Sequence, residues 1–130
     1  MSIAIILNAK PSECEKIMNG NKTMVVAKAP YPIVSIPFRC YIYCSDPLRK
    51  VIGEFVCDQV YELAPLNHAP ADVEQQACMT REEIVKAIEC DGFAWHISNL
   101  NIYKTSKELS YYTSLIKHHP YNWRYIAIHE

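Results

Sequence analysis

The segment Phe38-Arg39-Cys40-Tyr41-Ile42-Tyr43-Cys44 is the clearest β-strand in the sequence. Apolar residues alternate along it, so that the side chains at even-numbered positions share one face of a predicted β-strand. Residues 45–50 contain Asp-Pro and favour a turn. The next stretch, Val51–Cys57, again has the composition of a strand, so the two segments predict an antiparallel pair. Gly53 marks a bulge or bend, which a β-barrel needs in order to curve.

The residues before this pair predict a strand, a helix and a second strand. Ile3–Leu7 is short, apolar and β-branched, which favours a buried strand. A helix is predicted over Pro11–Met18, because proline is acceptable in a first helical turn, and Gly20 provides the left-handed stop. A strand over Thr23–Val26 follows. The inward-facing residues of the helix are predicted to be Cys14, Ile17 and Met18.

The second half of the chain predicts a loop, a helix and further strands. Residues 64–77 carry two prolines and no clear periodicity, which predicts a surface excursion within the domain. Thr80-Arg81-Glu82-Glu83 is a capping box that begins a helix ending near residue 90. The capping box precedes the apolar residues Ile84, Val85 and Ile88 of this helix. The remaining segments predict strands at Phe93–Ile97, Ile102-Tyr103 and Tyr125–Ile128, and a short helical turn at Lys107–Leu109.

Length and composition predict one folded domain over residues 1–130. Half of the residues are hydrophobic and 21% are charged, which excludes a mainly disordered chain. No apolar run is long enough to cross a membrane and no secretion signal is present, so we expect a cytoplasmic protein without a membrane partner. The formal net charge is −1, which excludes a global attraction to nucleic acid. Residues 1–57 nevertheless hold seven Lys/Arg against four Asp/Glu, so if the protein has an anion site, it is expected in this half.

The six cysteines predict free thiols and no disulfide framework, because nothing marks secretion. They contain no Cys-x-x-Cys pair, and Cys40 and Cys44 have the spacing of two side chains on one packed face of a strand. Zinc binding by some of Cys78, Cys90, His118 and His119 matches no common ligand spacing. We therefore expect no metal and no other cofactor.

The order and spacing of several short signatures resemble those of ASCH domains, the small members of the PUA-like superfamily, and in particular the short ASCH proteins of Firmicutes and their phages. The resemblance covers nearly the whole chain. Its signatures are Asn8-Ala9-Lys10-Pro11 after the first strand, Gly20-Asn21-Lys22-Thr23, Tyr41-Ile42-Tyr43-Cys44-Ser45, Lys50-Val51-Ile52-Gly53-Glu54-Phe55, Gly92-Phe93-Ala94-Trp95-His96-Ile97 and Pro120-Tyr121-Asn122-Trp123-Arg124-Tyr125.

The resemblance implies an α+β fold, a small partly closed β-barrel with flanking helices, and a cleft for RNA or a nucleotide-like ligand. It places Lys10, Lys22 and Lys28 around this cleft, where flexible ammonium groups suit phosphate. Aromatic rings offer faces on which bases stack, and polar side chains offer hydrogen bonds to a base edge. The candidate residues are Tyr121 and Trp123 for stacking and Ser45 and Asn122 for hydrogen bonding, while Trp95 fits the core better than a stacking platform.

The chain departs from the family pattern in the second strand. Relatives commonly carry Glu-x-Arg where this chain has Val25 and Ala27, so ligand specificity does not transfer, and a lost or altered site stays an alternative. Some ASCH proteins are amidohydrolases with a lysine, a threonine nucleophile and a glutamate. Lys22 fits the lysine, but the threonine position falls at Val25 and the glutamate position falls near Glu74. Thr23 would replace the nucleophile only after a shift of register.

Three functions therefore remain open. The first is a non-catalytic domain that binds RNA or a modified nucleotide, with phosphate held by the three lysines. The second is an amidohydrolase or ribonuclease acting on a modified nucleoside or RNA. The third is a protein-interaction module of phage or host regulation, which the nine tyrosines would suit.

Overall fold

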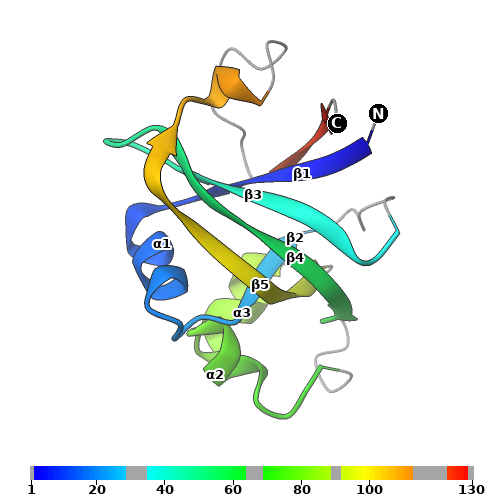
Figure 1. The fold of residues 1–130 in the computed structure, drawn as a ribbon. Coiled ribbons are helices and arrows are strands. Elements are labelled where there is room, and N and C mark those ends of the chain that lie inside the picture. Colours follow the sequence, from blue (N-terminus) through cyan, green and yellow to red (C-terminus); the bar gives the residue numbers. More distant parts are fainter. Residues whose placement is uncertain (1, 29–34, 64–68, 89–91, 113–122, 129–130) are drawn as a thin grey trace.

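A computed structural model describes residues 2–28, 35–63, 69–88, 92–112 and 123–128. Its strands form one six-stranded sheet in the order β2-β5-β4-β3-β1-β6, in which β1 and β3 are parallel and the other neighbours are antiparallel (Figure 1). The sheet curves into a partly closed barrel with flanking helices, which confirms the predicted α+β class. The elements are β1 (Ser2–Ala9), α1 (Pro11–Met18), β2 (Met24–Lys28), β3 (Phe38–Cys44), β4 (Lys50–Glu62), α2 (Val73–Ala77), α3 (Arg81–Ile88), β5 (Gly92–Lys107), the 3-10 helix η2 (Leu109–Tyr111) and β6 (Trp123–Ile128).

Strand β3 lies in the interior of the sheet, between β1 and β4, and is buried on both faces. The even-numbered residues pack into the main core, as predicted. Tyr41 and Tyr43 on the opposite face are also buried, within a second cluster that includes Ile6 and Ile126. Apolar side chains on both faces of one strand let the same sheet support two layers of packing. The main core is formed around Ile5, Ile17, Cys40, Ile42, Phe55 and Trp95.

The long antiparallel strands β4 and β5 give the sheet its curvature. Their register shifts at several points, including the neighbourhood of Gly53, which confirms the predicted irregularity there. A Cβ atom on Gly53 would lie 2.6 Å from the backbone oxygen of Asn101, so glycine permits the close approach of β5. Strand β5 runs without interruption through the two segments predicted separately, and it ends at Lys107, before η2. The predicted helical turn is therefore displaced to Leu109–Tyr111.

The helices begin and end close to the predicted residues, but fewer of their apolar side chains are buried than the sequence pattern suggests. Met18 is 52% exposed, so the prediction that it faces inward is wrong, and Val85 of α3 is 48% exposed. The capping box is confirmed: the Thr80 hydroxyl accepts from the Glu83 N–H at 3.1 Å, and the Glu83 carboxylate accepts from the Thr80 N–H at 2.9 Å. The surface excursion predicted for residues 64–77 is wrong at its end, where α2 buries Val73 and Ala77.

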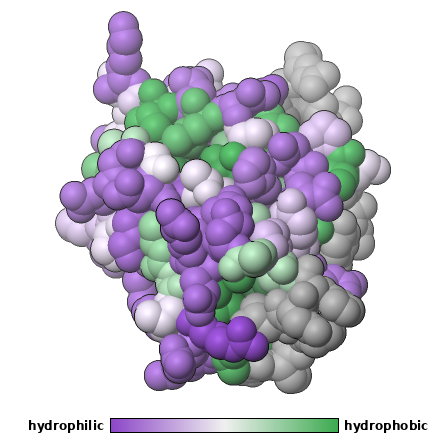
Figure 2. All heavy atoms as spheres, turned by 90° about the horizontal axis from the view of Figure 1, so that it is seen from below, coloured by the Kyte–Doolittle hydropathy of each residue, from purple (hydrophilic) through white to green (hydrophobic). Residues whose placement is uncertain are grey.

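Three further properties bear on the predictions. Cys14, Cys40, Cys44, Cys57 and Cys78 are free thiols, as predicted, whereas Cys90 lies outside the described residues. None of the described helices is long and apolar enough to span a membrane. Over the same residues, His, Cys, Asp and Glu side chains form no group suited to hold a metal ion. The surface at the end that carries α2 and α3 is largely hydrophilic, with hydrophobic residues gathered in separate patches (Figure 2).

Candidate functional site

A cavity of about 340 Å³ lies where the end of β1 meets α1, β2 and α3. This volume is within the range of small-molecule sites, roughly 300–1,000 Å³. Its wall combines apolar side chains with an amide, a carboxylate and two amines. The lining residues are Leu7, Asn8, Ala9, Lys10, Glu13, Ile17, Lys22, Val25, Val26, Ala27, Met79 and Ala87.

The end of α1 brings Lys22 to this cavity. The backbone N–H of Gly20 donates to the carbonyl of Ile17 at 3.1 Å, and Gly20 adopts a positive φ of 83°. The N–H of Lys22 then donates back to the carbonyl of Lys16 at 3.0 Å. This turn is possible because glycine adopts the left-handed conformation without steric cost. It directs the chain from the helix into β2. The Lys22 side chain is consequently buried, with 6% of its surface exposed.

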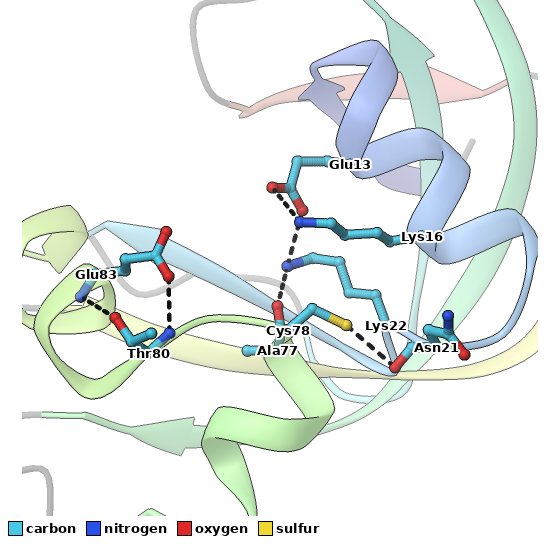
Figure 3. Close-up of polar contacts among 8 residues, drawn as sticks. All are labelled: Glu13, Lys16, Asn21, Lys22, Ala77, Cys78, Thr80 and Glu83. Atoms are coloured by element: carbon cyan, nitrogen blue, oxygen red, sulfur yellow. Dashed lines mark hydrogen bonds and ion pairs between the residues drawn. The ribbon is translucent and has the colours of Figure 1, made fainter.

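Two oxygen atoms hold the Lys22 ammonium (Figure 3). Its Nζ donates to the backbone oxygen of Ala77 at 2.6 Å and lies 3.3 Å from Oε2 of Glu13. Ala77 is the last residue of α2, so its carbonyl lacks a partner within the helix, and a positive charge at a helix C-terminus is favourable. The first contact is a hydrogen bond and the second is an ion pair. Lys22 therefore joins α1 to α2 while remaining part of the cavity wall.

Further contacts fasten the same two segments together. The Thr23 N–H donates to the carbonyl of Gln76 at 2.8 Å, and the Thr23 hydroxyl donates to the side-chain oxygen of Gln76 at 3.1 Å. The Cys78 thiol contacts the backbone oxygen of Asn21 at 3.3 Å, as Figure 3 also shows. Because the Thr23 hydroxyl bonds to α2 and Thr23 is not a lining residue, it does not take the position of a nucleophile in the cavity.

The second amine belongs to Lys10, an exposed residue at the boundary between β1 and α1. Lys10 and Lys22 thus line one cavity, together with the Glu13 carboxylate. Two ammonium groups and one carboxylate leave this wall with a net positive charge. Glu13 also lies 3.6 Å from Lys16 through its other oxygen, so its charge is shared between two lysines. An anionic ligand group would therefore meet a positive field at Lys10.

The other predicted site residues are placed differently. Ser45 is partly exposed, and its backbone N–H donates to the Ala9 carbonyl at 2.9 Å, but it does not line the cavity. Lys28 and Trp123 belong to β2 and β6, but their side chains fall outside what the structure describes, as do Tyr121 and Asn122 entirely. Trp95 is fully buried and packs edge-on against Phe38, with ring centroids 5.6 Å apart, so it offers no stacking face to a ligand.

Sequence reasoning missed two polar residues of the cavity. Asn8 and Glu13 both line the cavity, but neither is among the site residues that the sequence predicts. No local pattern pairs Glu13 with Lys22, since the pairing depends on how the chain turns after α1. Val25 and Ala27, which stand in place of charged residues in the resemblance, also line the cavity and make that part of its wall apolar.

Comparisons with known proteins identify the fold. No protein-family model matches the sequence, and no curated protein matches it either. Crystal structures of the ASCH protein from Zymomonas mobilis do match, at 15% identity and a TM-score of 0.76 over 95% of this chain and 87% of that chain. A serine-to-alanine variant of that protein gives 15% identity and a TM-score of 0.79, covering 95% of this chain and 88% of that one. A tyrosine-to-phenylalanine variant gives 14% and 0.75, covering 95% and 90%. The chain therefore has the fold of the ASCH proteins.

Proposed function

We propose that this protein binds RNA or a nucleotide-like ligand in the cavity between β1, α1 and β2. The observation that carries the proposal is the convergence of Lys10 and Lys22 on one cavity of about 340 Å³. Such a volume accepts a nucleoside or nucleotide, and a small number of polar groups fixes the orientation of a ligand between apolar walls. The ASCH fold, which is associated with RNA binding, supports the same ligand class.

Different residues of the cavity lining suit different parts of a nucleotide. Lys10 is exposed and flexible, so its ammonium suits a phosphate at the mouth of the cavity. Glu13 accepts hydrogen bonds, as an exocyclic amine of a base would require, and Asn8 has both donor and acceptor atoms. Leu7 and Val25 supply apolar contact for a base. Lys28, Ser45, Tyr121, Asn122 and Trp123 remain predicted contributors to ligand binding.

The lining favours binding over covalent hydrolysis. Val25 occupies the position at which the resemblance puts a threonine nucleophile, and its side chain is buried in the wall. Among the described residues that line the cavity, none carries a hydroxyl or a thiol. A mechanism with a threonine nucleophile, the kind that the resemblance implies, needs a hydroxyl beside an activating base. Hydrolysis of a modified nucleoside is therefore the alternative that the binding experiment must also monitor.

Calorimetric titration at low salt with a panel of nucleosides, nucleoside monophosphates and single-stranded RNA tests the proposal. We expect saturable binding at micromolar concentrations, tighter for the monophosphate than for its nucleoside because Lys10 contacts phosphate. The variant Lys10→Gln should lose about tenfold in affinity for the monophosphate. Lys104→Gln removes another exposed lysine that does not line the cavity and should leave this affinity unchanged.

Two outcomes would contradict the proposal. The first is an absence of saturable binding across the whole panel. The second is an equal effect of Lys10→Gln and Lys104→Gln, which would mean that the lysines attract ligand through overall charge alone. Chromatography of each ligand after incubation gives a separate readout, because new products that disappear in Lys22→Met would establish the hydrolytic alternative.

A further inference from the structure

We propose that Tyr111 and Lys107 form a second binding site, which takes one base and its phosphate from single-stranded RNA on the face of the sheet opposite the cavity. The inference rests on the proposed function for its ligand class and adds a separate site. Stacking of a base on an exposed aromatic ring beside a cation is the common chemistry of single-strand binding. The two residues lie at the junction of β5 and η2.

Tyr111 is an exposed ring held in a defined position. Its side chain is 69% exposed, although it is a large hydrophobic group. Lys107 Nζ lies 4.3 Å from the centroid of the Tyr111 ring and 5.1 Å from that of Tyr103, so the ammonium contacts two rings. Tyr112 packs edge-on against Tyr111, with centroids 5.1 Å apart and an interplanar angle of 73°. The exposed remainder of the Tyr111 ring is the surface on which a base would stack.

A hydrogen-bonded chain fixes the rings behind Tyr111. The Tyr112 hydroxyl donates to the Tyr103 hydroxyl at 2.9 Å, and the Tyr103 hydroxyl donates to Oε2 of Glu54 at 2.6 Å. Burial raises the pKa of both tyrosines, so these hydroxyls keep their protons at neutral pH. Tyr112 also packs on Tyr41 of β3, with centroids 4.5 Å apart. A ring that is fixed before binding loses little conformational entropy when a base stacks on it.

The charges nearby leave Lys107 available to a phosphate. Arg39 Nη1 lies 3.9 Å from Oε1 of Glu54, so the carboxylate that accepts from Tyr103 is also paired with an arginine. Glu108 pairs with Lys50 at 3.6 Å. Within the described part of the chain, no carboxylate forms an ion pair with Lys107. Its ammonium therefore combines a position beside an exposed ring with an uncompensated positive charge.

The second site lies on the other face of the sheet from the cavity. Tyr103 and Tyr112 pack against the cluster that contains Ala4 and Ile6, whereas the cavity is lined by Leu7 and Ala9. Successive residues of β1 point to opposite faces, so these two sets belong to opposite sides of the strand. Figure 1 shows the orange segment with η2 beyond the end of β5, at the opposite end of the molecule from α2 and α3. One nucleotide cannot occupy both sites.

Fluorescence anisotropy with a labelled single-stranded oligonucleotide, measured beside monophosphate calorimetry, tests the second site. Tyr111→Ala should weaken oligonucleotide binding by about 5- to 150-fold, the range for loss of one stacked base. Lys107→Gln should also weaken it. Neither change should alter monophosphate binding in the cavity. Tyr111→Phe retains the ring and should bind like the wild type, and Lys86→Gln, on an exposed face of α3, is the matched charge control.

The outcomes separate this inference from the proposed function. Unchanged oligonucleotide binding in Tyr111→Ala overturns the second site alone, provided that Lys10→Gln still weakens the monophosphate. If neither ligand binds the wild type, both proposals fail. Photocrosslinking with 4-thiouridine RNA gives a readout that does not depend on substitution, and crosslinks should map to the peptide containing Tyr111. Crosslinks confined to other peptides would contradict the inference. This would also be the result if this face binds a protein and no RNA.

Discussion

Lys22 has two roles: it connects two helices, and it forms part of the cavity wall. Its ammonium neutralises the carbonyl end of α2 and pairs with Glu13, while its side chain forms part of the cavity wall. A buried cation without partners would be strongly unfavourable, so these two contacts stabilise the ammonium in this position. Lys10 has no such constraint because it is exposed. The fixed amine therefore shapes the site, and the exposed amine is the one free to follow a ligand.

The contacts of Lys22 predict a measurable loss of stability when the charge is removed. Lys22→Met keeps the length of the side chain but removes the hydrogen bond to the Ala77 carbonyl and the ion pair with Glu13. We expect the free energy of unfolding to fall by about 2 kcal/mol, as for loss of a hydrogen bond to a charged group. Urea denaturation followed by circular dichroism measures this difference.

Lys16→Met is the matched control, because Lys16 pairs with the same carboxylate from an exposed position on α1. Its effect should remain within about 0.5 kcal/mol, since exposed ion pairs contribute little. Equal losses in the two variants would mean that Lys22 contributes no more than an ordinary surface charge.

At the scale of single residues, the sequence predicted the two lysines of the cavity but not their chemical surroundings. The resemblance supplied Lys10 and Lys22, since a lysine after a strand or a helix carries no distinctive pattern of its own. The hydrogen bond from Lys22 to Ala77 could not be predicted, because Ala77 contributes a backbone atom. It also belongs to α2, a helix in a region where the sequence predicted a loop. Contacts made by backbone atoms cannot be predicted from residue type, because every residue carries the same backbone carbonyl.

Helix α1 shows why the inward faces of short elements are hard to predict. Met18 shares a helical stripe with Cys14, yet it is the last residue of the helix and lies beside an open hollow with the exposed Leu48. Periodicity gives the direction of each side chain, but a side chain is buried only where another part of the protein packs against it. In α3, Ile84 and Ile88 satisfy both conditions, whereas Val85 is turned toward solvent.

The crossing of β4 and β5 predicts that Gly53 tolerates no side chain. In Gly53→Ala, the new Cβ would lie 2.6 Å from the Asn101 oxygen and 3.1 Å from the Ile102 Cα, both backbone atoms. The strands would have to separate, so we expect a loss of about 1–3 kcal/mol, the usual cost of overpacking. Thermal unfolding monitored by circular dichroism detects such a change.

Gly20→Ala provides the comparison for this prediction. Gly20 has a positive φ of 83° but nothing within 4 Å of the Cβ position, so this substitution introduces backbone strain of about 1 kcal/mol without a clash. Unfolding transitions that are indistinguishable between Gly53→Ala and the wild type would show that β5 does not approach β4 as closely as described.

For the whole molecule, local patterns account for the elements better than for their arrangement. Alternation and β-branched composition located most of the strands, and the capping box located α3. The position of β1 between β3 and β6 joins segments from the two ends of the chain, and no local pattern encodes it. The resemblance to ASCH domains filled this gap, and the structural match at about 15% identity shows that the same arrangement is compatible with very different side chains.

The two-sided burial of the sheet makes a thiol on its interior strand a probe of global unfolding. Cys40 is fully buried on β3, and Cys57 is fully buried on β4, where burial raises its pKa to about 11. At pH 8 about one Cys57 in a thousand would be a thiolate, the form that reacts. Cys78 is only partly buried at the C-terminus of α2.

Thiol labelling under native conditions, followed by peptide mass spectrometry, should therefore modify Cys78 before Cys40 and Cys57. Labelling of Cys40 requires the sheet to open, so it should be slower by on the order of a thousandfold or more, given the usual stability of a folded domain. The free energy calculated from its labelling rate should equal the one obtained from urea denaturation. Labelling of Cys40 at the rate of Cys78 would contradict the packing of two layers against one sheet, since a thiol between intact layers cannot reach the reagent.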